Sequence, residues 1–171
     1  MNALVNKVEQ SGILVIDLAE LIPAPKYIRL DLGDFLDGGV VLRERAFRLA
    51  LKSLAWEEYN GHSVLLCYPK EAIIPRWAFM LVMSYLNPHA KNVVVGTDRD
   101  MHRYWTEKVI SEVDLLSYRN KRVILKGCTA PHIEENAYAL MSNRLIGIVQ
   151  SLMYGEPCSS VPVYKRKAAS A

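Results

Sequence analysis

Two stretches of this sequence align with each other without gaps at a constant offset of 59 residues. Residues 59–86, YNGHSVLLCYPKEAIIPRWAFMLVMSYL, lie over residues 118–145, YRNKRVILKGCTAPHIEENAYALMSNRL. Extended to residues 96 and 155, the alignment holds eight identities in 38 positions, whereas roughly two or three are expected from average composition. The apolar positions agree as well, so the alignment predicts two copies of one structural unit.

Each copy has the pattern of a βαβ unit. Short apolar runs bounded by turn-forming residues predict strands at 63–68, 92–96, 122–127 and 151–155. Apolar residues at helical spacing after Pro75 predict a helix at 75–86, and an acidic first turn predicts a helix at 98–113. Glu134 and Glu135 suit the start of a helix from about 133 to 148. Parallel strands joined by a helix need a right-handed crossover, so two such units side by side predict a mostly parallel sheet covered by helices.

The predicted repeats cover residues 59–96 and 118–155. The N-terminal third of the chain precedes them and is predicted to form a β/α extension. The runs ILVIDL (13–18) and YIRLDL (27–32) are typical of strands, and LRERAFRLALKSL (42–54) is typical of an amphipathic helix. Two strands so close in sequence suggest an antiparallel edge or cap. The predicted fold class is therefore α/β.

Composition limits the number of domains and the compartment. The chain has 171 residues, 51% of them hydrophobic, and a net charge of +3, which fits one α/β domain over residues 1–163. The basic run YKRK opens a predicted flexible tail, residues 164–171, and is too local to indicate nucleic-acid binding. The sequence has no apolar run long enough to span a bilayer and no signal-peptide pattern, and its three cysteines are an odd number. A cytoplasmic protein in a reducing compartment is expected.

Two cysteines fall where the predicted parallel strands end. Cys128 directly follows the strand at 122–127, and Cys158 lies three residues past Gly155. Ligands of parallel sheets usually bind at this carboxyl edge. Cys67 lies inside a predicted strand, so we expect it in the core.

The second copy has gained polar groups at the same edge. Cys128 replaces Pro69 of the first copy, and His132 replaces Ile73. One interpretation is a metal or iron–sulfur site, with Cys128 and Cys158 as thiolate ligands of iron or zinc and His132 or Glu156 completing the shell.

Other interpretations of these residues stay open. A thiol near a helix N-terminus can have a lowered pKa and be reactive, and buried cysteines often act only as small hydrophobes. His132 fits a hydrogen-bonded loop residue as well. The run DRDMH (98–102) has the appearance of a metal motif, but acids are favoured at a helix start in any case. The common nucleotide-binding and zinc-protease motifs are absent from the sequence.

Four stretches, GILVIDL, IIPRWAFM, KRVILKGC and YGEPCSSVPVYKRK, resemble an uncharacterised bacterial family of unknown function over nearly the whole chain. Members of that family are often encoded beside components of iron–sulfur cluster assembly. The resemblance therefore implies a role near cluster assembly, with assembly proteins as partners. Cys128 and Cys158 correspond to its Gly-Cys and Glu-Pro-Cys motifs, which marks both as candidate site residues.

These observations together predict an accessory binding protein for iron or an iron–sulfur cluster, using thiols at the carboxyl edge. A thiol-dependent enzyme or a small-anion-binding protein that uses the same edge is the alternative. A purely structural partner protein is a third possibility, and the apolar composition suggests that the chain forms a homodimer or another homo-oligomer.

Overall fold

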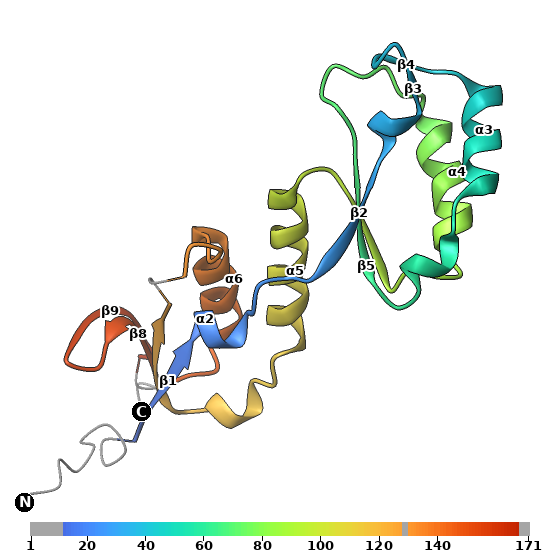
Figure 1. The fold of residues 1–171 in the computed structure, drawn as a ribbon. Helices are drawn as coiled ribbons and strands as arrows, with labels where there is room; N and C mark the ends of the chain where they lie inside the picture. The colour runs from blue at the N-terminus through green and yellow to red at the C-terminus, as the bar shows by residue number, and fades with distance from the viewer. Residues whose placement is uncertain (1–11, 128–129, 168–171) are drawn as a thin grey trace, which may run out of the picture. The chain divides into compact units, whose positions relative to one another are not determined.

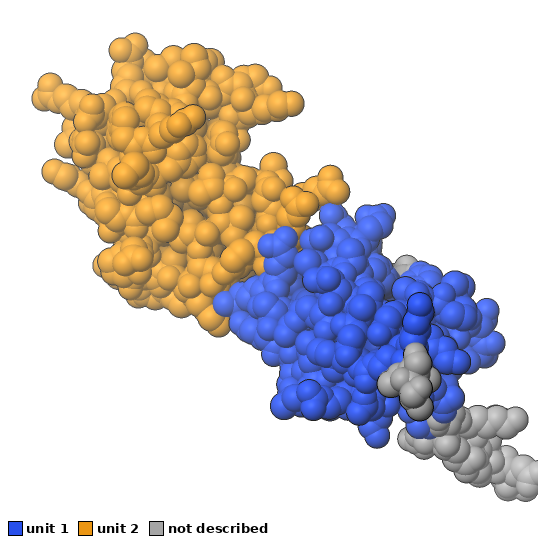
Figure 2. All heavy atoms as spheres, turned by 180° about the vertical axis from the view of Figure 1, so that it is seen from behind, with its two compact units in different colours: residues 1–24, 105–171 blue, residues 25–104 orange. Residues whose placement is uncertain are grey.

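The computed structural model describes residues 12–127 and 130–167. It has the predicted α/β class, with parallel sheets and flanking helices (Figure 1). The chain forms two compact units, which Figure 2 colours separately: unit 1 contains residues 1–24 and 105–171, and unit 2 contains residues 25–104. Unit 2 is therefore inserted into the sequence of unit 1. No helix in the described ranges is long and apolar enough to cross a membrane.

Unit 1 is built on a four-stranded sheet in the order β1-β7-β8-β9. Its strands are β1 (Ile13–Asp17), β7 (Arg122–Lys126), β8 (Ser151–Glu156) and β9 (Ser159–Lys165). The first three are parallel, and β9 returns antiparallel to β8. Its helices are α2 (Leu18–Leu21), the part of α5 (Asp98–Glu112) from residue 105 on, η3 (Leu116–Tyr118) and α6 (Glu135–Leu145). Apolar side chains of α2, α5 and α6 pack on one face of this sheet and form the core of unit 1.

Unit 2 is built on a three-stranded parallel sheet in the order β2-β5-β6. Its strands are β2 (Tyr27–Asp31), β5 (Ser63–Cys67) and β6 (Asn92–Val95), with a small antiparallel pair, β3 (Leu36–Asp37) and β4 (Val41–Leu42). Its helices are η1 (Leu32–Phe35), α3 (Glu44–Ser53), η2 (Trp56–Tyr59) and α4 (Arg76–Leu86). The core lies between the sheet and the helices α3 and α4, where Phe47 and Val82 are fully buried.

The strands and main helices of the two units keep the same spacing in the sequence. Strand β5, helix α4 and strand β6 begin at residues 63, 76 and 92, and β7, α6 and β8 begin at residues 122, 135 and 151. We call two residues 59 positions apart counterparts. The counterparts Leu86 and Leu145 are both fully buried at the end of their helices.

The two N-terminal strands do not pair with each other, contrary to the expected antiparallel edge. Strand β1 joins β7 in parallel, and β2 joins β5 in parallel. Each ends on an aspartate that accepts a backbone N–H of the next turn, Asp17 from Ala19 and Asp31 from Gly33. Alternating apolar residues predict a strand but not its partner. The helix α2 and an extended stretch separate the strands, where an antiparallel pair would need only a tight turn.

The first two residues of the expected tail, Tyr164 and Lys165, belong to strand β9 and pair with β8. Tyr164 packs against the core of unit 1. The guanidinium of Arg166 donates to the carbonyl of Ile148 at 2.7 Å and to the side chain of Asn120 at 2.6 Å. This apolar contact and these hydrogen bonds hold the basic segment on the domain. Residues 168–171 lie outside the described residues.

Candidate functional site

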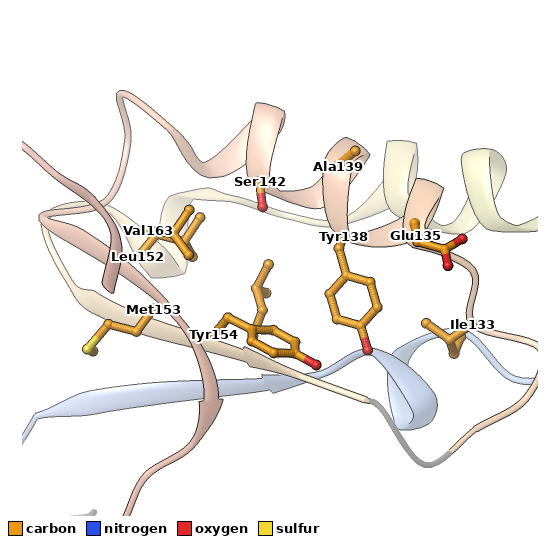
Figure 3. Close-up of a pocket in the computed structure, with 10 residues that line it drawn as sticks. Ile133, Glu135, Tyr138, Ala139, Ser142, Leu152, Met153, Tyr154 and Val163 are labelled. Atoms are coloured by element: carbon orange, nitrogen blue, oxygen red, sulfur yellow. The ribbon is translucent and has the colours of Figure 1, made fainter. Parts of the chain in front are cut away.

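A pocket of about 520 Å³ lies in unit 1 between helix α6 and the strands β8 and β9 (Figure 3). Its lining is mostly apolar and comes from β7, the segment before α6, α6 itself, β8 and β9. The lining residues are Leu125, Ile133, Glu135, Tyr138, Ala139, Ser142, Leu152, Met153, Tyr154 and Val163. The volume lies in the range of pockets that hold small organic molecules.

Strand β9 supplies one side of this pocket through Val163. The turn before it depends on Gly155, whose φ of 116° is unfavourable for residues with a side chain. A Cβ atom at Gly155 would lie 2.7 Å from the backbone oxygen of Ser159. Pro157 and Cys158 form the turn, and proline sets φ for such a position. The glycine therefore lets β9 fold back closely on β8.

Two tyrosines form the aromatic part of the pocket. Tyr138 points from α6 toward the sheet, and Tyr154 lies beside it on β8 (Figure 3). Their ring centroids are 5.6 Å apart and their planes make an angle of 79°, an edge-to-face arrangement. Glu135 and Ser142 add polar atoms to the lining. The pocket is thus suited to a small, largely apolar molecule that has a ring or another flat group.

A charged pair marks the carboxyl edge of the same sheet. Nζ of Lys126 lies 3.0 Å from a carboxylate oxygen of Asp17. The hydrogen bond from Lys126 holds the pKa of Asp17 below its ordinary value, and the same bond raises the pKa of Lys126. The charges of Glu156 and Glu20 also raise the pKa of Lys126. One lysine therefore faces several carboxylates at this edge.

The predicted thiol site is only partly within the described residues. Cys158 is exposed, and its thiol is free. It lies in the turn between β8 and β9, beyond the carboxyl end of β8. Cys128 lies outside the described residues. Cys67 ends β5 and is partly buried; burial raises its thiol pKa, and the charge of Asp31 adds to that effect.

The two auxiliary residues of the predicted site have different surroundings. Nε2 of His132 lies 2.9 Å from the carbonyl oxygen of Ile22, so this nitrogen donates to the backbone, and only Nδ1 remains for another partner. Glu156 is exposed at the end of β8. Among residues 12–127 and 130–167, no three His, Cys, Asp or Glu side chains group in a way that could hold a metal ion.

The run DRDMH forms the start of helix α5 in unit 2. Asp98 accepts hydrogen bonds from the hydroxyl of Tyr27 and the guanidinium of Arg29. Asp100 accepts from the backbone and the hydroxyl of Thr97, at 2.8 and 2.7 Å. Both carboxylates therefore anchor the helix start, as the helix interpretation of this run predicts.

No sequence pattern indicated the pocket. Its residues come from segments that are far apart in the sequence, and no motif joins them. One signal was present: the counterparts of Tyr154 and Ser142 are Val95 and Met83. Tyr154 and Ser142 therefore carry polar atoms where their counterparts are apolar, as Cys128 and His132 do.

A family model described as "Protein of unknown function (DUF2480)" matches residues 2–166, so the chain belongs to that family. No curated protein matches the chain, and no solved structure does.

Proposed function

Starting from membership in a family of unknown function, we propose that this chain is a binding protein whose pocket in unit 1 takes a small, largely apolar molecule. The observation that carries the proposal is the pocket of about 520 Å³ between α6, β8 and β9. Ligand pockets are typically apolar cavities of this size with a few polar groups that orient the ligand.

The lining suggests how a ligand is held. The T-shaped pair of Tyr138 and Tyr154 offers ring faces and edges to a flat group. Ile133, Met153 and Val163 keep exposed apolar surface in the pocket, and its burial by a ligand drives binding. Glu135 is the one carboxylate in the described lining, and it orients a hydrogen-bond donor on the ligand.

Fluorescence of the neutral probe N-phenyl-1-naphthylamine tests this function. The probe is expected to bind the wild-type chain, and the substitution Ala139→Phe, which fills the pocket, is expected to weaken binding at least about tenfold, which corresponds to about 1.4 kcal/mol. Asn143→Phe is the matched control, because Asn143 is exposed on the same helix and does not line the pocket. Equal binding by Ala139→Phe, or no binding by the wild type, contradicts the proposal.

A second candidate function is the delivery or transient holding of iron or an iron–sulfur cluster in the cytoplasm, with iron–sulfur assembly proteins as partners. The observation that favours it is the exposed free thiol of Cys158 in the turn after β8. Cys158 lies two residues after Glu156 in the sequence. Cys128 would be the second thiolate. His132 would bind through Nδ1, because Nε2 already bonds to a carbonyl. Thiolates and imidazoles are ligands of iron and zinc.

Metal and acid-labile sulfide content after anaerobic purification tests the second candidate. Iron or zinc that is bound by the wild type and lost in the double variant Cys128→Ser/Cys158→Ser supports it. A wild type without metal after reconstitution rules it out. The pH dependence of Cys158 alkylation then distinguishes a reactive thiol from an inert one.

The shared spacing of the units also supports a proposal about their origin. We infer that β5-α4-β6 and β7-α6-β8 are two copies of one βαβ unit, since all three elements begin 59 residues apart in the two units. The N-terminal strands fit the same scheme. Asp31 of β2 pairs with Cys67, Asp17 of β1 pairs with Lys126, and Lys126 is the counterpart of Cys67.

A further inference from the structure

The outer edge of β6 in unit 2 differs from the outer edge of its counterpart strand β8. Strand β8 is covered by the antiparallel strand β9. In the described part of the chain, β6 ends its sheet and pairs only with β5. An open edge presents unpaired N–H and C=O groups to another strand. We propose that β6 pairs with β6 of a second copy of this chain, so that the two sheets become one.

The backbone shows which groups are open. The N–H of Gly96 donates to the carbonyl of Leu66 on β5, at 3.1 Å. Residues alternate in direction along a strand, so Val94 also points its backbone groups at β5, and Val93 and Val95 point theirs outward. Two antiparallel copies satisfy these groups when Val93 bonds to the partner's Val95 and Val95 bonds to the partner's Val93. The two-fold axis then passes beside Val94.

Strand β6 is short, with four residues, but it lacks the other features that normally protect an edge. Its sequence, Asn-Val-Val-Val, contains no charge and no proline, and no bulge interrupts its pairing with β5. Natural edge strands are usually protected by charged residues, proline or bulges. β9, which forms an outer edge of the other sheet, contains Pro162 and a register shift.

Helix α4, whose buried residues share a core with Val93 of β6, has an apolar surface as well. Met80 of α4 is 73% exposed, and its counterpart is Ala139 in the pocket of unit 1. Met83 stands where α6 has Ser142, and Val95 is 46% exposed. Arg76 is the one charged residue of α4. A second copy on the two-fold axis would bring its own Met80 to the same interface and cover both.

The charges around the strand favour the antiparallel arrangement. Exposed Lys91 precedes β6, and the carboxylate of Asp100, which accepts from the backbone and the hydroxyl of Thr97, follows it, whereas Asp98 is already paired with Arg29. With Val93 opposite Val95 of the other copy, Lys91 lies opposite Thr97 and the Asp100 carboxylate bonded to it, whereas a parallel pair in register places Lys91 beside Lys91.

Sedimentation equilibrium over a range of concentrations tests this interface. The wild type is expected to form a dimer. Met80→Glu places a charge in the interface, and Val95→Pro removes an outward N–H without removing a bond to β5, so both are expected to be monomeric with the circular dichroism of the wild type. Leu116→Glu is the control, because Leu116 is 74% exposed in unit 1, and this variant is expected to stay dimeric. A monomeric wild type, or a dimer that persists in either interface variant, overturns the proposal.

Cross-linking tests the register independently. In a chain in which Cys67, Cys128 and Cys158 are replaced by serine, Val94→Cys is expected to give a disulfide-linked dimer on oxidation with copper phenanthroline, since the two Cα atoms would lie about 4.5 Å apart. Leu116→Cys in the same chain is the control and is expected to remain uncross-linked. Equal cross-linking of both variants, or none of Val94→Cys, contradicts the two-fold axis at Val94.

Discussion

Units 1 and 2 have the same strand and helix spacing but complete their sheets differently. In unit 1 the hairpin from β8 to β9 adds a strand, and a pocket forms between that strand and α6. In unit 2 the described residues add no strand beside β6, and apolar side chains such as Met80 stay exposed there. The difference teaches that one added strand decides whether the space beside the crossover helix becomes a pocket or stays open.

The two units also differ at the last turn of that helix. Arg144 of α6 donates to the carbonyls of Ile110 and Val113 near the end of α5. Its counterpart Tyr85 stacks on Trp56 instead, with ring centroids 5.0 Å apart. A polar end cap in one unit is thus replaced by aromatic packing in the other.

The largest expected effect comes from the identical counterparts Leu145 and Leu86. Replacing either by alanine leaves a cavity in a fully buried site and is expected to cost about 2–5 kcal/mol of unfolding free energy. Hydrogen exchange read by mass spectrometry should show lost protection in unit 1 for Leu145→Ala and in unit 2 for Leu86→Ala. Equal loss in both units from each variant would mean that the units unfold as one.

Arg144→Ala should have the next largest effect. It leaves two carbonyl oxygens of the α5 end without their side-chain donor and is expected to cost roughly 1–3 kcal/mol in urea unfolding. Tyr85→Phe is the control in unit 2, because it keeps the ring stacked on Trp56. A stability of Arg144→Ala equal to that of the wild type would show that the cap does not stabilise unit 1.

The identical glycines Gly155 and Gly96 separate the two sheet ends further. Both have positive φ, 116° and 142°, so alanine at either is strained by about 1–2 kcal/mol. At Gly155 the new Cβ also meets the backbone of Ser159, whereas at Gly96 it meets the side chain of Asp100, which can move. Gly155→Ala should therefore lower the thermal midpoint more than Gly96→Ala; the reverse order would argue against a close β8–β9 turn.

The smallest effect concerns Asp17 and acid stability. The hydrogen bond from Lys126 lowers the pKa of Asp17 in the folded chain, so its contribution is present above the ordinary carboxyl pKa. That contribution is lost as the pH falls through the lower folded-state value. Asp17→Asn lacks this contribution, so its unfolding free energy should vary less with pH over that acid range. Parallel urea titrations of both proteins measure the difference, and identical slopes would contradict it.

The sequence predicted the secondary structure of the central elements well. The helix expected at 75–86 runs from 76 to 86, and the strand expected at 122–127 ends at 126. These elements have strong apolar periodicity and clear turn signals at their ends. The partners of β1 and β2 were not predictable, because side-chain alternation gives the faces of a strand and not its neighbour.

The C-terminal hairpin and the pocket were missed for a related reason. Pro162 and the polar residues at the start of β9 are not typical of a strand. Its strand character depends on pairing with β8 and on the fit of Tyr164 to the core. Cys158 was expected beyond the carboxyl end of the strand at 151–155, and it lies in the turn after β8. The roles of Cys128, Cys158, His132 and Glu156 remain predictions.

The most direct test of the central claim is a methyl NMR titration with N-phenyl-1-naphthylamine. If the strand β9 makes a ligand pocket in unit 1, the methyl signals of Leu125, Leu152 and Val163 should shift with one saturable dissociation constant. Their counterparts beside β6, Leu66 and Val93, should stay unchanged. Equal shifts in both units, or none at the three pocket residues, would contradict the account.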